Sequence, residues 1–188
     1  MKVDQGYNSE SSSDEDEEFN HLQDAEPDQQ TMNSEILVTT PDGLGSNKYT
    51  IYLGLLDSRA SGSLADKKII FSYPNSKTKT IETTWQTKAS SFKTSKEVEV
   101  ERLCLPQFTA KRKINTKFHL FDKNKEDTYS FILGRDFCQL VGLDVLNSKN
   151  TFEWGSIQVK MVPRDYWDDR DIQKFWATKK PSNLPKEE

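Results

Sequence analysis

Two short stretches of the chain decide its fold. The first, residues 55–63, reads LLDSRASGS, and the second, residues 131–136, reads FILGRD. In each stretch, apolar residues lead into Gly, Ser and charged residues, which is typical of a buried strand that ends in a turn. Taken singly, a carboxylate after a strand more often forms a turn than carries out catalysis. An Ile-Leu-Gly run is more often a core segment that leads into a helix than part of a functional site.

The sequence around these stretches predicts many short strands. Residues 97–101 read EVEVE, so Val98 and Val100 should be buried on one face of a strand. One helix is expected from near residue 135 to Gly142, a suitable C-cap. Strands are expected at residues 36–40, 49–56, 68–73, 79–85, 96–105, 114–121, 129–133, 143–146, 151–154 and 157–162. This pattern favours an all-β fold, a closed or sandwich-like domain with one short C-terminal helix.

Charge is distributed unevenly along the chain. Residues 1–35 carry eleven acidic side chains and one basic one, a net charge of −10, whereas the whole chain has −4. Residues 1–33 have few apolar groups and are predicted to be a disordered acidic tail. A folded domain is expected at residues 34–166 and a C-terminal linker at 167–188. Within the linker, Trp167, Phe175 and Trp176 could lie along one side of a short helix and pack on the domain.

Composition excludes several classes of protein. No apolar run approaches the ~18–20 residues of a membrane span, and the polar, acidic N-terminus is not a signal peptide. Cys104 and Cys138 are too few for a disulfide scaffold or a zinc finger and are expected to be small core residues. We therefore expect an intracellular, cytoplasmic protein without metal or cofactor and without a membrane partner. With only two histidines and no Gly-x-Ser-x-Gly elbow or phosphate loop, an enzyme would most naturally use carboxylates.

The two stretches together, in this order, resemble the retropepsin family, the aspartic proteases of retroviruses and LTR retrotransposons. In that family an apolar pair followed by Asp-Ser/Thr-Gly-Ala holds the catalytic Asp, and a later apolar-apolar-Gly-Arg segment packs beneath it. The resemblance covers roughly residues 48–166. Its C-terminal part is similar to Gag-Pol-type polyproteins of retrotransposons in particular. It implies an acid-protease half-barrel that works as a homodimer, and retroelement particles are a place where such a protease would be found.

The resemblance also implies a mechanism. Such proteases need two carboxylates that share one proton across a bound water, and this chain has one motif, so a second copy must supply the other. Asp57 is then the catalytic residue that activates water to cleave a Gag/Pol polypeptide. Ser58 would brace the two loops across the dimer. The remaining residues that would form or support the loop are Arg59, Ala60, Ile132, Leu133, Gly134 and Arg135.

A flap is expected between the two motifs. Residues 85–94 resemble the flap of related retrotransposons, a mobile hairpin that closes over an extended peptide by strand-like hydrogen bonds. The residues expected to contact substrate there are Thr87, Lys88, Ala89, Ser90, Ser91 and Phe92.

Three positions depart from the family pattern. Arg59 stands where the motif has Gly, and a long cation there should crowd the dimer axis, favour ionised Asp57 and oppose the shared proton. Ser90 aligns with a second lost Gly at the flap tip. Ser61 replaces an acid that pairs, in retroviral relatives, with the Arg matching Arg135. We therefore predict weak or absent proteolysis despite a retained fold.

Three hypotheses remain open at the level of sequence. The first is an aspartic endopeptidase of a retroelement, active or recently so. The second is a catalytically inactive dimer of the same fold that serves as a binding or scaffold module. The third and least favoured is a basic β-domain that binds nucleic acid through Lys111, Arg112 and Lys113. Asp57 favours the first two, and Arg59 separates them. His119 is expected on the exposed or half-buried side of a strand.

Overall fold

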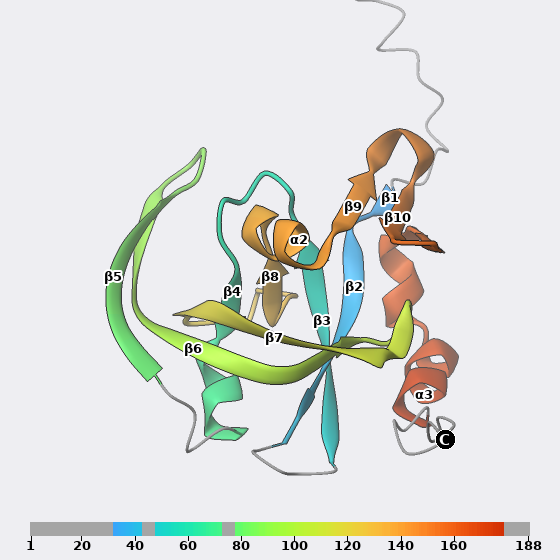
Figure 1. Cartoon of the computed structure of the whole chain (residues 1–188), viewed down its shortest axis with the longest axis horizontal. Coiled ribbons are helices and arrows are strands. Elements are labelled where there is room, and N and C mark those ends of the chain that lie inside the picture. Colours follow the sequence, from blue (N-terminus) through green and yellow to red (C-terminus); the bar gives the residue numbers. More distant parts are fainter. Residues whose placement is uncertain (1–31, 43–47, 73–77, 179–188) are drawn as a thin grey trace, which may run out of the picture. The chain divides into compact units, whose positions relative to one another are not determined.

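The computed structural model describes residues 32–42, 48–72 and 78–178 (Figure 1). Almost all of the predicted acidic tail, residues 1–31, and the last ten residues, 179–188, lie outside the described part. None of the helices among the described residues has the length and apolar character needed to cross a membrane.

One large sheet forms the body of the domain. In spatial order its strands are β2 (Glu35–Pro41), β3 (Tyr49–Leu56), β8 (Phe131–Leu133), β4 (Leu64–Asp66), β7 (Thr109–Phe121), β6 (Ser91–Leu105) and β5 (Thr78–Gln86). A further pairing of β2 with β6, between Thr39 and Cys104, closes all of these strands except β5 into a barrel. The expectation of a mostly-β closed domain is confirmed.

Smaller elements complete the domain. An antiparallel sheet joins β9 (Leu143–Leu146), β10 (Thr151–Trp154) and β11 (Ile157–Lys160), and β1 (Met32–Asn33) pairs with β12 (Val162–Pro163). The helices described are α2 (Arg135–Val141), α3 (Arg170–Thr178) and the 3-10 helices η1 (Lys67–Ser72), η2 (Asn147–Lys149) and η3 (Arg164–Asp168).

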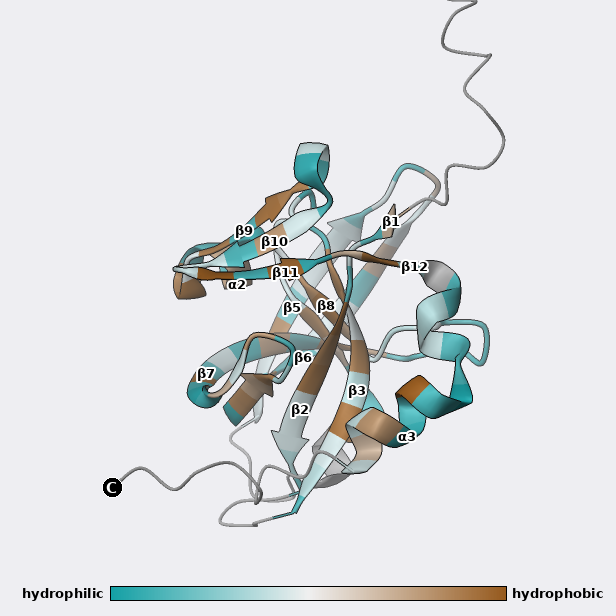
Figure 2. Ribbon diagram, turned by 90° about the vertical axis from the view of Figure 1, so that its right-hand side faces the viewer, coloured by the Kyte–Doolittle hydropathy of each residue, from teal (hydrophilic) through white to brown (hydrophobic). Residues whose placement is uncertain are grey.

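Alternating apolar residues build the barrel interior. Val98 and Val100 are buried as predicted, while the intervening Glu99 is exposed. Phe118 and Phe131 are fully buried, with ring centroids 5.1 Å apart in an edge-to-face arrangement. Figure 2 shows apolar segments along the central strands β2 and β3. The same core continues to the buried face of α2 and to the small sheet.

Helix α2 begins and ends where the sequence predicts. Gly142 adopts a left-handed conformation (φ 72°), and its N–H donates to the Cys138 carbonyl at 2.9 Å, which ends the helix. Cys138 in this helix and Cys104 in β6 are both buried, as expected of small core residues.

The strand expected at residues 68–73 is wrong, because residues 67–72 form the 3-10 helix η1. The Asp66 carboxylate accepts the Lys68 N–H at 3.2 Å and so turns the chain directly after β4. The sequence reasoning missed β4 itself, which pairs with β7 on one side and β8 on the other.

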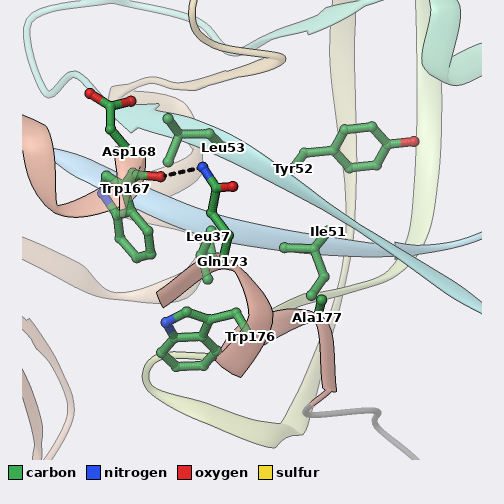
Figure 3. A pocket seen from close by; sticks show the side chains of 9 residues that line it. All are labelled: Leu37, Ile51, Tyr52, Leu53, Trp167, Asp168, Gln173, Trp176 and Ala177. Atoms are coloured by element: carbon green, nitrogen blue, oxygen red, sulfur yellow. Dashed lines mark hydrogen bonds between the residues drawn. The ribbon is translucent and has the colours of Figure 1, made fainter. Parts of the chain in front are cut away.

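The expectation of a single helix is also wrong, because α3 follows within the expected linker. Asp169 accepts the Asp171 N–H at 2.8 Å at the start of α3, and Gln173 donates to the Trp167 carbonyl at 2.8 Å. Trp167 and Trp176 line a pocket of about 400 Å³ against β2 and β3 (Figure 3). Phe175 is 49% exposed, so the three aromatics do not share one packed side.

We predict that Phe131→Ala lowers the free energy of unfolding by about 3–5 kcal/mol, because it empties the centre of the barrel between Phe118 and Tyr52. Urea denaturation followed by circular dichroism measures the change. Leu140→Ala, at a side chain that is 62% exposed, is the control and should change stability by less than about 0.5 kcal/mol. Equal losses in the two variants would contradict the packing described here.

Candidate functional site

The fold brings the two sequence stretches side by side. β3 and β8 run parallel, with Leu55 opposite Ile132 and Leu56 opposite Leu133. The backbone N–H of Asp57 donates to the Leu133 carbonyl at 3.0 Å and so extends this pairing by one step. Asp57 therefore sits at the end of β3, where the strand gives way to a loop.

The loop that follows Asp57 is tied to the start of α2. The Ala60 N–H donates to the Asp57 carbonyl at 3.0 Å, and the Arg135 N–H donates to the Ala60 carbonyl at 2.8 Å. The Arg135 guanidinium reaches the same loop, donating from Nε to the Ser58 carbonyl at 3.3 Å. These bonds hold residues 57–60 against the first helical residue.

Gly134 allows this close approach. A Cβ at this position would lie 2.5 Å from the Gly62 carbonyl oxygen and 2.9 Å from that of Ala60. Both neighbours are backbone atoms, which cannot rotate away as a flexible side chain can. Of the expected support residues, Ile132, Leu133, Gly134 and Arg135 thus lie next to the loop that carries Asp57.

A hydrogen-bonded pair, the buried Ser63 and the exposed Asp136, fixes the other end of the loop. The Ser63 hydroxyl donates to Asp136 Oδ1 at 2.7 Å and accepts the Gly134 N–H at 2.9 Å, while the Ser63 N–H donates to Asp136 Oδ2 at 3.2 Å. Ser63 is only 1% exposed. The sequence analysis did not predict this pair. Asp136 directly follows Gly134 and Arg135, and its position in that motif could have indicated a role in supporting the loop. Within the described residues Arg135 forms no ion pair, so the two charged residues at the start of α2 hold the loop by hydrogen bonds, Arg135 to Ser58 and Asp136 to Ser63.

Asp57 itself is partly open and carries a cationic neighbour. Its side chain is 30% exposed, and its Oδ1 accepts the Arg59 backbone N–H at 3.0 Å. Arg59 Nε lies 3.5 Å from the same oxygen, although the Arg59 side chain is 89% exposed. An ion pair this exposed contributes little to stability.

The residues expected in a flap form the tip of a hairpin. β5 and β6 pair up to Gln86 and Ser91, and the Thr87 N–H donates to the Ser90 carbonyl at 2.8 Å. In Figure 1 the tip stands at the same end of the domain as the loop between β3 and β4. The candidate contact residues, Thr87, Lys88, Ala89, Ser90, Ser91 and Phe92, are all exposed. Ser90 has no positive φ, so this turn does not require glycine there.

One side chain joins the hairpin to the loop. A Cβ at Gly62 would lie 2.5 Å from Cη2 of Trp85, which comes from β5. Trp85 falls within the expected flap range but was not among the candidate contact residues. The half-buried His119, placed as expected, meets the Trp85 ring edge-to-face at 5.1 Å, and its Nε2 lies 3.8 Å from Glu97.

Both cysteine thiols are poorly suited to nucleophilic chemistry. Burial raises the pKa of Cys138 to about 11, with further contributions from the Asp136 and Asp144 carboxylates. Burial also raises the pKa of Cys104. Both thiols therefore stay protonated at neutral pH. Among the described residues, no group of three or more His, Cys, Asp or Glu side chains could hold a metal ion.

No family model matches the chain, and no curated protein matches it. Among solved structures, the chain is similar to the crystal structure of the retroviral protease-like domain of Ddi1 from Leishmania major. The two share 13% sequence identity, and the match covers 72% of this chain and 96% of that chain with a TM-score of 0.45. A likeness this remote assigns no activity and no residue role to this chain.

We predict that Ser63→Ala lowers the free energy of unfolding by about 1–3 kcal/mol, because the Asp136 carboxylate and the Gly134 N–H lose a buried partner. Urea denaturation measures the loss. Ser61→Ala, at an exposed position in the same loop, is the matched control and should be nearly neutral. A Ser63→Ala variant as stable as the control would show that the pair does not anchor the loop.

We predict that Cys138 in the folded chain reacts with iodoacetamide at pH 9.0 more slowly than in the urea-unfolded chain, because its folded pKa lies near 11 rather than at the ordinary 9.0. Folding keeps this thiol protonated, so its contribution to stability is present below pH 9.0 and is lost as pH rises toward 11. Mass spectrometry of timed samples gives the rate at each cysteine. Equal rates in the two states would contradict the described burial.

Proposed function

We propose that this chain is an aspartic endopeptidase of retropepsin type from a retrotransposon polyprotein, acting as a homodimer, with activity reduced by Arg59. The observation that carries the proposal is the placement of Asp57 at the end of β3, on a loop tied to Gly134 and Arg135. A partly exposed carboxylate on a rigid loop, beside a projecting hairpin, is half of the site that such an enzyme needs.

The second half of the site would come from a second copy. Two carboxylates about 3 Å apart cannot both ionise easily, so they share one proton. The ionised carboxylate takes a proton from water, and the protonated one donates to the carbonyl oxygen of the peptide bond. The 30% exposure of the Asp57 side chain leaves it open to such a partner. Ser58, also exposed, would brace the two loops against each other.

Arg59 opposes this chemistry in two ways. Its guanidinium lies 3.5 Å from Asp57 Oδ1, on the carboxylate that would have to meet the carboxylate of the second copy. Its side chain is also long and 89% exposed on the loop that would face the second copy. Both effects support reduced activity in a chain that keeps the fold.

The substrate class that fits is an extended polypeptide. β5 lies at the edge of the large sheet, and residues 87–92 at its tip are exposed, so the hairpin can lie over a bound strand. A Gag/Pol polypeptide of the parent element is the substrate proposed.

A catalytically inactive dimer that serves as a binding module is the second candidate, and Arg59 is the observation that favours it. A nucleic-acid interface has less support. Arg112 stacks on Trp154 at 4.9 Å, and Lys113 donates to the Tyr49 hydroxyl at 3.1 Å, so two of the three clustered cations make contacts within the domain.

The proposal predicts that Arg59→Gly raises cleavage of a Gag-derived peptide at acidic pH by tenfold or more, which corresponds to about 1.4 kcal/mol of transition-state stabilisation. Asp57→Asn in the Arg59→Gly chain should abolish the cleavage. Lys125→Gly, which removes an exposed cation from a turn, is the matched control and should leave the rate unchanged. Chromatography of the cleaved peptide gives the rates, and sedimentation gives the oligomeric state.

The outcomes separate the two candidates. A dimer in which neither the wild-type chain nor the Arg59→Gly variant cleaves would favour the binding module. A chain that stays monomeric at high concentration and cleaves nothing would overturn the proposal. Cleavage that survives Asp57→Asn would overturn the assignment of Asp57.

A further inference from the structure

We propose that Trp85 is a positioning residue that latches the β5–β6 hairpin onto the Asp57 loop, with Gly62 as its receiving site. The inference deepens the proposed function, on which the link to Asp57 chemistry rests. The latch itself stands on contacts between described residues and does not require catalysis.

The Trp85 ring packs closely against Gly62 and fills the space beside it. A Cβ at Gly62 would lie 2.5 Å from Cη2 and 3.0 Å from Cζ3 of the Trp85 ring. These atoms belong to the far edge of the indole, so the ring occupies the space that a side chain at position 62 would need. Glycine is thus required at this position by the neighbouring ring, while the backbone there has no positive φ.

Three neighbours fix the orientation of the Trp85 ring. Its Nε1–H donates to Thr94 Oγ1 at 2.9 Å, and Thr94 is only 3% exposed. Phe92, opposite Trp85 in the hairpin, stacks on it with ring centroids 6.3 Å apart. His119 from β7 meets the ring edge-to-face at 5.1 Å. A ring held this way cannot turn aside from Gly62 without losing these contacts.

The latch joins two segments that are otherwise open to solvent. Ser58, Arg59 and Ser61 are exposed on the loop, and residues 86–93 are exposed on the hairpin. Only one residue after Gly62, the buried Ser63 anchors the chain through its hydrogen bond to Asp136. Lifting the hairpin would therefore withdraw the ring from Gly62 and leave the loop held by Ser63 and by the bonds from Arg135 to the Ser58 and Ala60 carbonyls. Hairpin position and loop order are coupled through this contact.

Hydrogen exchange of the full-length chain tests the latch without requiring activity. Trp85→Ala should speed exchange of the amides in residues 57–63 by tenfold or more, including the hydrogen-bonded Ala60 and Ser63 amides. Trp85→Phe, which keeps an aromatic ring but lacks the far edge of the indole that meets Gly62, should also speed exchange, though less than Trp85→Ala does. Peptides from β7 serve as the internal control and should exchange at the wild-type rate in every variant.

Gly62→Ala disrupts the same contact by changing the residue that faces the Trp85 ring. It should speed loop exchange as much as Trp85→Ala does, because the methyl group expels the ring. The double variant should be no faster than either single one, since both remove the same interaction. Phe92→Ala, which removes a ring from the hairpin but leaves Trp85, is the matched control and should have a smaller effect.

The results distinguish the latch from the proposed function. Unchanged loop exchange in Trp85→Ala would overturn the latch, even if the chain cleaves peptides through Asp57. Faster exchange throughout the barrel would also overturn it, because Trp85 would then be a general packing residue. Faster exchange confined to the loop, in a chain that cleaves nothing even with Arg59→Gly, would support the latch and reject proteolysis.

Discussion

The close approach of Gly134 to the Asp57 loop is the constraint on which the rest of the site depends. Because position 134 has no side chain, the Gly62 and Ala60 carbonyls can lie where a Cβ would otherwise be. The start of α2 then sits directly against the loop, within hydrogen-bonding distance of its carbonyls. The placement of Asp57, the first turn of α2 and the hydrogen bonds between Ser63 and Asp136 all depend on this close approach, which a methyl group at position 134 would prevent.

The same constraint connects the site to the core. β8 contributes buried Phe131 and Leu133 to the barrel and then leads, at Gly134, into the contact with the loop. β6 runs from the tip of the hairpin into the barrel, where it pairs with β2 and β7. The hairpin is therefore an extension of a core strand. Trp85 can contact Gly62 because the hairpin and the loop both continue from strands of the same sheet.

Local sequence patterns were sufficient to predict structure where a residue's conformation depends on its neighbours along the chain. The alternation around Val98 and the C-cap at Gly142 are of this kind, and both agree with the structure. β4 could not be found in this way, because its three residues follow a Ser-Gly-Ser turn and become a strand by pairing on both sides. The 3-10 helix after it depends on a side-chain bond from Asp66, and the Trp85–Gly62 contact depends on tertiary geometry. Sequence motifs thus identified the loop and its support, while the contacts that hold them together needed the fold.

Arg59 shows how far the fold and the chemistry of this site can separate. The contacts that hold the loop centre on the buried residues Gly134 and Ser63, whereas the Arg59 side chain is 89% exposed. An exposed ion pair adds little to stability, so a cation at this position leaves the scaffold intact. In the proposed dimer, the approach of a second carboxylate is far more sensitive to this cation, because its guanidinium already lies 3.5 Å from Asp57 Oδ1. A chain can therefore keep every structural feature of the site and still differ in activity through this one exposed residue.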